Sequence, residues 1–222
     1  MGDVIGETLA FAVGVAVSPI PIAAVIVMLF TPKAKTNAPS FMGGWIIGLL
    51  VVGFIILLIP GLEVSTGEPS MTTGVIKGLL GVLLLAAGWA AWRKRPGSGE
   101  TAEAPKWMDA IDSFGVGKSA GMGFMLSALN PKNLLLVAGA AVVISTSGLS
   151  TSEEVGALLV FTLIAASTVA VPVIVYLIVG DRADSALANA KDWLIQNNSV
   201  VMAILLLVFG VSLIGDAIEI LF

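Results

Sequence analysis

Apolar residues run in six long segments along the chain, with polar and charged residues gathered between them. The segments span residues 5–31, 40–60, 71–92, 117–146, 153–180 and 195–221. Each segment reaches the length of about 20 residues that an α-helix needs to cross the hydrocarbon core of a bilayer. The first and fourth lie near the upper limit of that length, which is typical of helices that are interrupted or tilted. The pattern therefore predicts an all-α membrane protein with six transmembrane helices.

Two polar motifs that contain proline interrupt the first and fourth segments. They are Ser18-Pro19-Ile20-Pro21 and Asn130-Pro131-Lys132-Asn133. Proline removes a backbone donor and clashes with the preceding helical turn, so we expect both helices to be broken there. Lipid cannot satisfy the freed backbone groups, and paired breaks in the two halves of a transporter indicate its binding site. The candidate substrate-binding residues are Ser18, Pro19, Pro21, Asn130, Pro131, Lys132 and Asn133.

The two motifs lie 112 residues apart, from Pro19 to Pro131, in a chain of 222 residues. The same spacing pairs other identical residues: Ala16 with Ala128, Val25 with Val137, Gly44 with Gly156 and Pro60 with Pro172. Three spans per half give the second half the opposite orientation, so the spacing predicts two inverted three-helix repeats. The expected division is a first repeat at 1–92, a cytoplasmic linker at 93–116 and a second repeat at 117–222. Six unrelated spans, two of them kinked, are the alternative.

The linker begins with a basic cluster, Arg93 to Arg95, which is followed by Pro, Gly and Ser residues. Such a cluster attracts anionic lipid headgroups, although it also ends a span without any such role. After Pro105 the sequence fits a short interfacial helix with an apolar face and an acidic face. The apolar residues are Trp107, Met108, Ile111 and Phe114, and the acidic residues are Asp109 and Asp112. A plain solvated linker is the alternative.

Lysine and arginine are concentrated in the connections after the first, third and fifth spans, which predicts that these connections are cytoplasmic. Nine of the eleven basic residues lie there: Lys33, Lys35, Arg93, Lys94, Arg95, Lys106, Lys118, Arg182 and Lys191. All five tryptophans, at positions 45, 89, 92, 107 and 193, fall near the same ends of the spans, and tryptophan prefers the headgroup level. We therefore expect a multi-pass protein of the cytoplasmic membrane with both termini outside. No Lys or Arg precedes the first apolar run, which favours a retained span over a cleaved signal peptide.

Lys132 is a charged residue that lies deep inside a predicted span. A charge at that depth is costly and indicates a functional site. Ser18 and Asn130 precede prolines as helix N-caps do, so we expect two half-helix N-termini near the middle of the bilayer. Helix N-termini beside a lysine favour an anion such as a carboxylate, phosphate or sulfate. Two other roles stay open for Lys132, which are to carry a proton or to bond a backbone carbonyl across the fold.

Composition narrows the range of functions. The chain is 57% hydrophobic and 12% charged, and it contains neither His nor Cys. This excludes thiol redox relays, haem ligation, metal sites built from Cys or His, and catalysis by Ser-His-Asp or Cys-His groups. No nucleophile and base pair falls at the depth of the bilayer centre, so we expect no enzymatic activity. We also expect no cofactor and no nucleic-acid partner. Glycines at helical spacing in spans two, three and four predict close helix packing.

Three parts of the sequence together resemble the GAP family of actinobacterial membrane proteins: Ser18 to Val25, Gly43-Gly44-Trp45 and the second proline motif. These are the glycopeptidolipid- and sulfolipid-addressing proteins, which are related to the lysine-exporter (LysE) superfamily. The resemblance covers essentially the whole chain. It implies a polytopic, cofactor-free protein that helps to move large envelope glycolipids across the cytoplasmic membrane, often alongside dedicated lipid exporters. The identity of the lipid does not carry over, since members are linked to different lipids.

Three functions agree with these features. The first is a transporter, or a flippase-like accessory, for an anionic or glycosylated envelope lipid, with membrane lipids and a larger lipid exporter as partners. The second is a LysE-like exporter of a small solute, such as an amino acid or an ion, coupled to protons or other cations. The third is a scaffold that stabilises a partner exporter without transporting anything itself. We favour the first, and a homodimer stays open.

Overall fold

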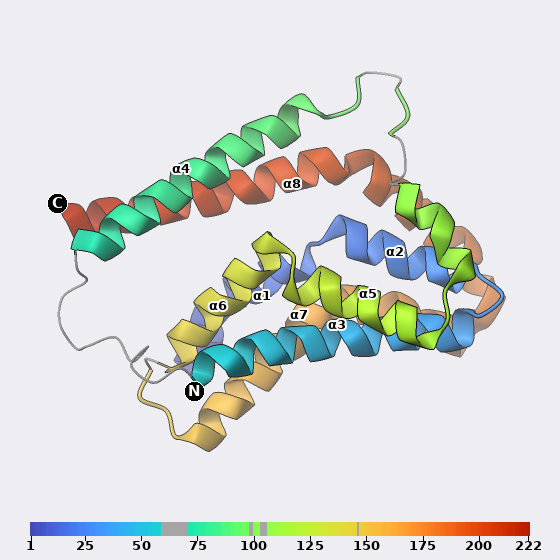
Figure 1. Cartoon of the computed structure of the whole chain (residues 1–222), viewed down its shortest axis with the longest axis horizontal. Helices are drawn as coiled ribbons and strands as arrows, with labels where there is room; N and C mark the ends of the chain where they lie inside the picture. Colours follow the sequence, from blue (N-terminus) through green and yellow to red (C-terminus); the bar gives the residue numbers. More distant parts are fainter. Residues whose placement is uncertain (59–70, 98–99, 103–105, 146) are drawn as a thin grey trace. The chain divides into compact units, whose positions relative to one another are not determined.

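The computed structural model describes residues 1–58, 71–97, 100–102, 106–145 and 147–222, which form helices and connecting turns without a β-strand. Figure 1 shows the elements in chain order. They are α1 (Gly2–Ala16), α2 (Pro19–Leu29), α3 (Ala34–Leu57), α4 (Met71–Arg93), the 3₁₀ helix η1 (Lys106–Ser113), α5 (Val116–Ala128), α6 (Pro131–Ser145), α7 (Thr151–Val179), the 3₁₀ helix η2 (Gly180–Ala183) and α8 (Asp184–Leu221).

The first and fourth predicted spans are each a pair of short helices that meet at a bend. The bend between α1 and α2 is 55°, and the bend between α5 and α6 is 64°. Both α2 and α6 begin at a proline, Pro19 and Pro131. Proline suits the first position of a helix but removes a hydrogen bond to the turn before it. The prediction that these two spans are broken at the proline motifs is confirmed.

Three helices, α3, α7 and α8, are long and apolar enough by themselves to cross a membrane. If each bent pair counts as one span, the described residues contain up to five candidate spans. α4 occupies the third predicted segment, and its apolar part among the described residues is Gly81–Arg93. The all-helical membrane-protein class is therefore supported, whereas the number of six spans stays a prediction.

The chain forms two compact units, and each is described by itself. The break unit comprises Met1–Val64 and Ala104–Asp192, and the α4–α8 unit comprises Ser65–Glu103 and Trp193–Phe222. Each unit draws residues from both halves of the chain, so the two units are not the two predicted repeats. The division into 1–92, 93–116 and 117–222 is a statement about sequence repeats and stays a prediction.

Helix contacts in the break unit largely correspond when the two halves of the chain are exchanged. α3 packs on α5 as α7 packs on α1, and α3 packs on α6 as α7 packs on α2. The contact of α2 with α3 likewise matches that of α6 with α7. One contact departs from this correspondence, because α1 packs on α6 much more extensively than α5 packs on α2.

The helices α3 and α5 approach closely through small residues, as the glycine spacing predicts. A methyl group added at Gly44 would collide with the backbone carbonyl of Ala120, and one added at Gly123 would collide with the carbonyl of Phe41. A methyl group added at three other glycines of these two helices would meet open space, namely at Gly43, Gly117 and Gly121. Only part of the predicted glycine pattern therefore serves this contact.

Trp45 lies in the α3–α5 contact and is completely buried. Phe41 and Phe161 are the other largest fully buried side chains of the described core. The ring of Trp45 therefore packs inside the protein and does not contact headgroups, so Trp45 gives no support to the predicted orientation. Trp89, Trp92 and Trp193 are exposed as that prediction requires, and the side chain of Trp107 lies outside the described part of the structure.

In the α4–α8 unit the two helices run antiparallel and lie side by side (Figure 1). A methyl group added at Gly81 would lie 2.9 Å from the carbonyl oxygen of Gly210, and one added at Gly88 would lie 3.3 Å from that of Ala203. Small residues thus set the distance between α4 and α8, as they do between α3 and α5.

Three local expectations need correction. The segment after Pro105 is a 3₁₀ helix that contacts α2, and Ile111 is fully buried in protein instead of facing the membrane surface. The predicted loop that carries Arg182 and Lys191 is largely helical, because α8 begins at Asp184 instead of near residue 195. The pairing of Pro60 with Pro172 predicted that both prolines end spans. Pro172 instead lies inside α7, and Pro60 lies outside the described residues. The side chains of Met108 and Asp109 are also outside them.

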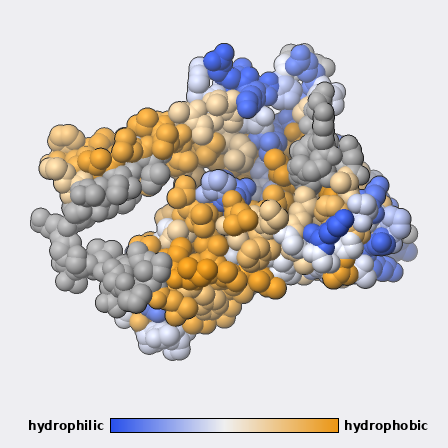
Figure 2. Space-filling model, viewed as in Figure 1, coloured by the Kyte–Doolittle hydropathy of each residue, from blue (hydrophilic) through white to orange (hydrophobic). Residues whose placement is uncertain are grey.

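Hydrophobic residues cover the middle of the helices on the visible face of both units, and hydrophilic residues gather near helix ends (Figure 2). Large apolar side chains such as Ile47 and Leu163 are exposed in the break unit. Apolar residues on the outside of an all-helical protein are expected where lipid replaces water as the solvent.

Candidate functional site

The first break frees backbone carbonyls at the end of α1. Val17 and Ser18 have non-helical backbone angles, and α2 starts at Pro19. Pro19 and Pro21 have no N–H, so they cannot donate to the carbonyls of Val15 and Val17 as a continuous helix would. The N–H of Ser18 donates to Ala16 O at 2.8 Å, which leaves the carbonyl of Gly14 without its helical partner. In a membrane each freed carbonyl needs a donor from the protein or from water.

Side chains from three helices supply these donors. The Ser18 hydroxyl donates to Val15 O at 2.7 Å, and the Thr168 hydroxyl of α7 donates to Ala16 O at 2.6 Å. The Lys132 ammonium of α6 donates to Gly14 O at 2.7 Å and to Val17 O at 3.1 Å. The break is therefore closed by hydrogen bonds that reach it from both halves of the chain.

Lys132 is fully occupied in this arrangement. Its third hydrogen bond goes to the Ser18 Oγ atom at 2.9 Å. A lysine ammonium has three donors, so all three are used by groups of the first break. A cation at the C-terminal end of a helix also interacts favourably with the helix dipole. This is the third of the roles considered for Lys132, in which it bonds backbone carbonyls across the fold.

The second break is closed by its own residues. The Asn130 side-chain oxygen accepts the N–H of Lys132 at 3.0 Å, so the prediction that Asn130 caps α6 is confirmed. The Asn133 side-chain amide donates to Leu126 O at 3.1 Å. The prediction that Ser18 caps α2 in the same way is wrong, because its hydroxyl makes no cap hydrogen bond and points back to α1.

Two differences between the motifs explain why the two breaks are closed differently: Asn133 corresponds to Pro21, and Lys132 corresponds to Ile20. At the spacing of 112 residues, Gly14 corresponds to Leu126 and Pro21 corresponds to Asn133. Asn133 supplies the donor for Leu126 O, whereas Pro21 has no side-chain donor for Gly14 O. Lys132 of the other half supplies it instead. The extensive contact of α1 with α6, which breaks the correspondence of the halves, is the contact that carries this lysine.

The predicted site residues thus fall into three groups. Ser18, Lys132 and Asn133 come together, since Ser18 Oγ lies 2.9 Å from Lys132 Nζ and 3.4 Å from Asn133 Oδ1. Asn130 orders the start of α6 without touching the first break. The three prolines act on the backbone, and Pro131 is exposed whereas Pro19 and Pro21 are buried. We call Ser18, Lys132, Asn133 and Thr168 the break cluster.

Thr168 was not among the predicted site residues. It lies in the uninterrupted apolar run of α7, where a threonine is commonly satisfied by its own helix. Its hydrogen bond joins residues 152 positions apart in the sequence. Nothing in the sequence indicates this partner beyond the presence of a polar side chain in a span.

The break cluster is nearly dry. Ser18 and Asn133 are buried, with 3% and 0% of their surface exposed, and Lys132 is half-buried. No group of three or more His, Cys, Asp or Glu residues that would hold a metal ion occurs in the described part of the chain. The chemistry available here is a cation, two hydroxyls and one amide surrounded by apolar helices, which can bind an anion or polar headgroup if the ammonium exchanges one of its present partners.

The comparison with known families is decisive at this point. A family model described as "Sap, sulfolipid-1-addressing protein" matches residues 8–219, which include both breaks and every helix from α2 to α7. The chain belongs to this family. The match confirms the resemblance drawn from the proline motifs, while the relation to the LysE superfamily stays a prediction.

The chain is therefore a membrane protein of a family named for the addressing of sulfolipid-1. No curated protein and no solved structure matches it. The family match indicates a membrane protein involved in lipid addressing or transport, whereas the lipid, the direction of movement and the binding site stay proposals.

Thr168 allows a test of how the first break is closed in this family member. Thr168→Val keeps the shape of the side chain and removes its hydrogen bond to Ala16 O, which still accepts the N–H of Ser18. We expect a loss of about 0.6–1.7 kcal/mol in unfolding free energy, the range of single hydrogen bonds between membrane helices. SDS-induced unfolding in mixed micelles measures it. Thr162→Val is the matched control, because Thr162 bonds only Leu158 O of its own helix; equal losses in both variants would contradict the interhelical role.

Proposed function

We propose that the protein moves an anionic or glycosylated envelope lipid across the cytoplasmic membrane, as a transporter or as a flippase-like accessory to a larger lipid exporter. One observation carries the proposal, which is the contact of the two broken helices through Lys132. A charged side chain inside a span and paired helix breaks each mark substrate sites in transporters, and here the half-buried Lys132 joins the two breaks. The membership of the sulfolipid-addressing family supports a lipid as the substrate.

The proposed step at the site is an exchange of partners on Lys132. A sulfate, phosphate or carboxylate headgroup competes with the carbonyls of Gly14 and Val17 for the ammonium, because a full negative charge attracts the ammonium more strongly than the partial charge of a neutral carbonyl does. Release of these carbonyls loosens the end of α1 from α6. Binding of the headgroup therefore favours a second arrangement of the break unit, as alternating access requires.

The proposal includes the predicted arrangement in the membrane. Two inverted three-helix repeats are supported by the correspondence of helix contacts in the break unit. Both termini outside and the basic connections in the cytoplasm are supported by the distribution of Lys and Arg. We propose no enzymatic activity, and as partners we propose membrane lipids, the transported lipid and a dedicated lipid exporter.

Deletion of the protein's gene, followed by analysis of extractable surface lipids, tests the proposed function. We expect an anionic or glycosylated lipid to disappear from the surface and to accumulate inside the cell, and the wild-type chain to restore it. Unchanged surface lipids would contradict the proposal. If the efflux of a labelled amino acid or ion changed instead, the chain would be an exporter of small solutes.

A further inference from the structure

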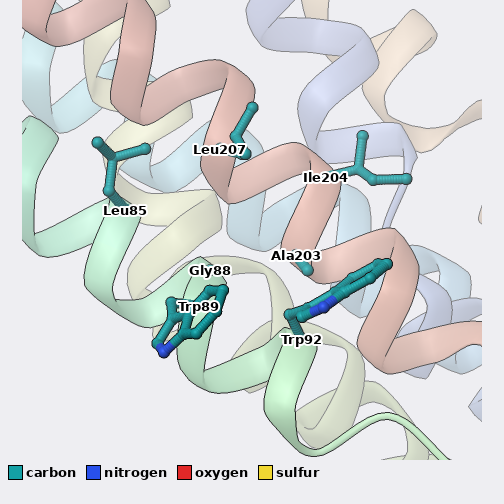
Figure 3. A pocket seen from close by; sticks show the side chains of 7 residues that line it. All are labelled: Leu85, Gly88, Trp89, Trp92, Ala203, Ile204 and Leu207. Atoms are coloured by element: carbon teal, nitrogen blue, oxygen red, sulfur yellow. The ribbon is translucent and has the colours of Figure 1, made fainter.

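The α4–α8 unit contains an apolar pocket that the proposed path through the breaks does not use. Its volume is 440 Å³, and seven residues line it: Leu85, Gly88, Trp89 and Trp92 of α4, and Ala203, Ile204 and Leu207 of α8. Figure 3 shows the two indole rings on the α4 side, opposite Ala203 and Leu207 on the α8 side. The indole N–H groups are the only polar side-chain groups among these residues, so the pocket suits a hydrocarbon chain.

Small residues explain why this pocket exists. Gly88 brings the backbone of α4 close to that of α8 at Ala203. Trp89 and Leu207 lie beside this contact and remain 65% and 56% exposed. Their exposed faces are the walls of the pocket. A pocket of this size lies within the range of about 300–1,000 Å³ that is typical of ligand sites.

A cluster of positive charge begins directly after the pocket residue Trp92. Arg93, Lys94 and Arg95 are all exposed. The guanidinium carbon of Arg95 lies 4.1 Å from the centre of the Trp92 ring, and Arg95 also donates to Trp92 O at 2.9 Å. The carboxylate of Glu100 lies in the same connection, where it accepts the N–H of Gly97, so it offsets only part of this charge. An apolar pocket and a basic cluster thus share one tryptophan.

We infer that this surface binds one anionic membrane lipid, with an acyl chain in the pocket and the headgroup at Arg93, Lys94 and Arg95. Tryptophan rings prefer the boundary between hydrocarbon and headgroups, which is where such a lipid changes from apolar to charged. Basic residues at the end of a span attract anionic headgroups. The site lies in the α4–α8 unit, and its existence does not depend on transport through the break cluster.

A second copy of the chain fits this surface less well. Two copies in one membrane have the same orientation, so a two-fold contact through this face would place both basic clusters at the same depth. The like charges of the two clusters would repel each other, whereas the headgroup of an anionic lipid neutralises them. Charge therefore favours the lipid as the occupant.

Native mass spectrometry of the full-length protein, released from micelles that contain phosphatidylglycerol and phosphatidylcholine, tests this inference. We expect one phosphatidylglycerol to be retained in preference to phosphatidylcholine. Inorganic phosphate in molar excess over the lipid should not displace it. Lys94→Gln with Arg95→Gln should weaken retention about thirtyfold, since each basic side chain near the surface contributes about fivefold. Leu207→Trp should weaken it by filling the pocket.

The matched control is Lys33→Gln with Lys35→Gln, which removes the same charge from exposed residues of the break unit. This control should retain phosphatidylglycerol as the wild type does. Equal loss in the control and in the Lys94 and Arg95 variant would overturn the site, and so would displacement by phosphate or equal retention of both lipids. A dimer that Leu207→Trp dissociates, with unchanged lipid retention, would show that a second copy occupies this face.

Discussion

Lys132→Ala is expected to destabilise the protein and to abolish lipid movement. The variant removes three hydrogen bonds that join α6 to the end of α1. At about 0.6–1.7 kcal/mol for each bond between membrane helices, the loss is about 2–5 kcal/mol. The lower part of this range is the better expectation, because removal of a half-buried charge recovers some of its desolvation cost. SDS-induced unfolding measures the stability, and the surface lipids of a complemented deletion strain measure the movement.

A second substitution separates these two effects. Pro21 occupies the position that Asn133 has in the second break, where the asparagine amide donates to Leu126 O. Pro21→Asn in the Lys132→Ala background offers an amide to Gly14 O in the same way. We expect this double variant to regain part of the lost stability but no lipid movement, since it has no cation at the break.

Gly44→Ala is expected to have the next largest effect, through stability alone. The added methyl group collides with the backbone carbonyl of Ala120, and a backbone atom cannot move aside as a flexible side chain can. Overpacking of this kind costs about 1–3 kcal/mol or more. The α3–α5 contact has to separate in response, and the buried Trp45 in the same contact should then become exposed. SDS-induced unfolding and tryptophan emission measure both changes.

The adjacent glycine is the matched control. Gly43 has open space where a methyl group would be added. Gly43→Ala should therefore be neutral or stabilising by up to about 1 kcal/mol, which is the difference in helix propensity between the two residues. Gly123→Ala and Gly121→Ala form a second pair of the same kind in α5, in which only Gly123 faces a backbone carbonyl of α3. Equal effects within either pair would contradict the close approach of the two helices.

The breaks could be predicted from the sequence because their cause is local. Proline alone does not break a helix, since Pro172 lies inside α7, but Pro19 and Pro131 each follow a polar residue that favours a helix start. The cap by Asn130 involves a partner two residues away. The partners of Lys132 could not be predicted, since they lie 114 to 118 residues earlier in the chain. The reversal of the Ser18 hydroxyl, from a cap of α2 to a donor for α1, follows from that same distant contact.

The glycine pattern shows the same limit. Spacing in the sequence predicted that span two packs through small residues, but Gly43 and Gly44 are equivalent by that criterion. Which of them faces α5 depends on the rotation of the whole helix, which the contacts of Trp45 and Phe41 help to fix. For Trp45 the same rotation decides whether the ring faces protein or lipid. The preference of tryptophan for the headgroup level does not contain that information.

The most direct test is the flip-flop of fluorescent lipids in proteoliposomes. It tests whether Lys132, which joins the two breaks, binds the anionic headgroup of a transported lipid. The wild-type chain should move a lipid with a phosphate or sulfate headgroup faster than a neutral one. The Lys132→Ala and Pro21→Asn double variant should move neither faster than empty vesicles, although it is folded. Movement of the anionic lipid by that variant at the wild-type rate would show that Lys132 only closes the broken helix.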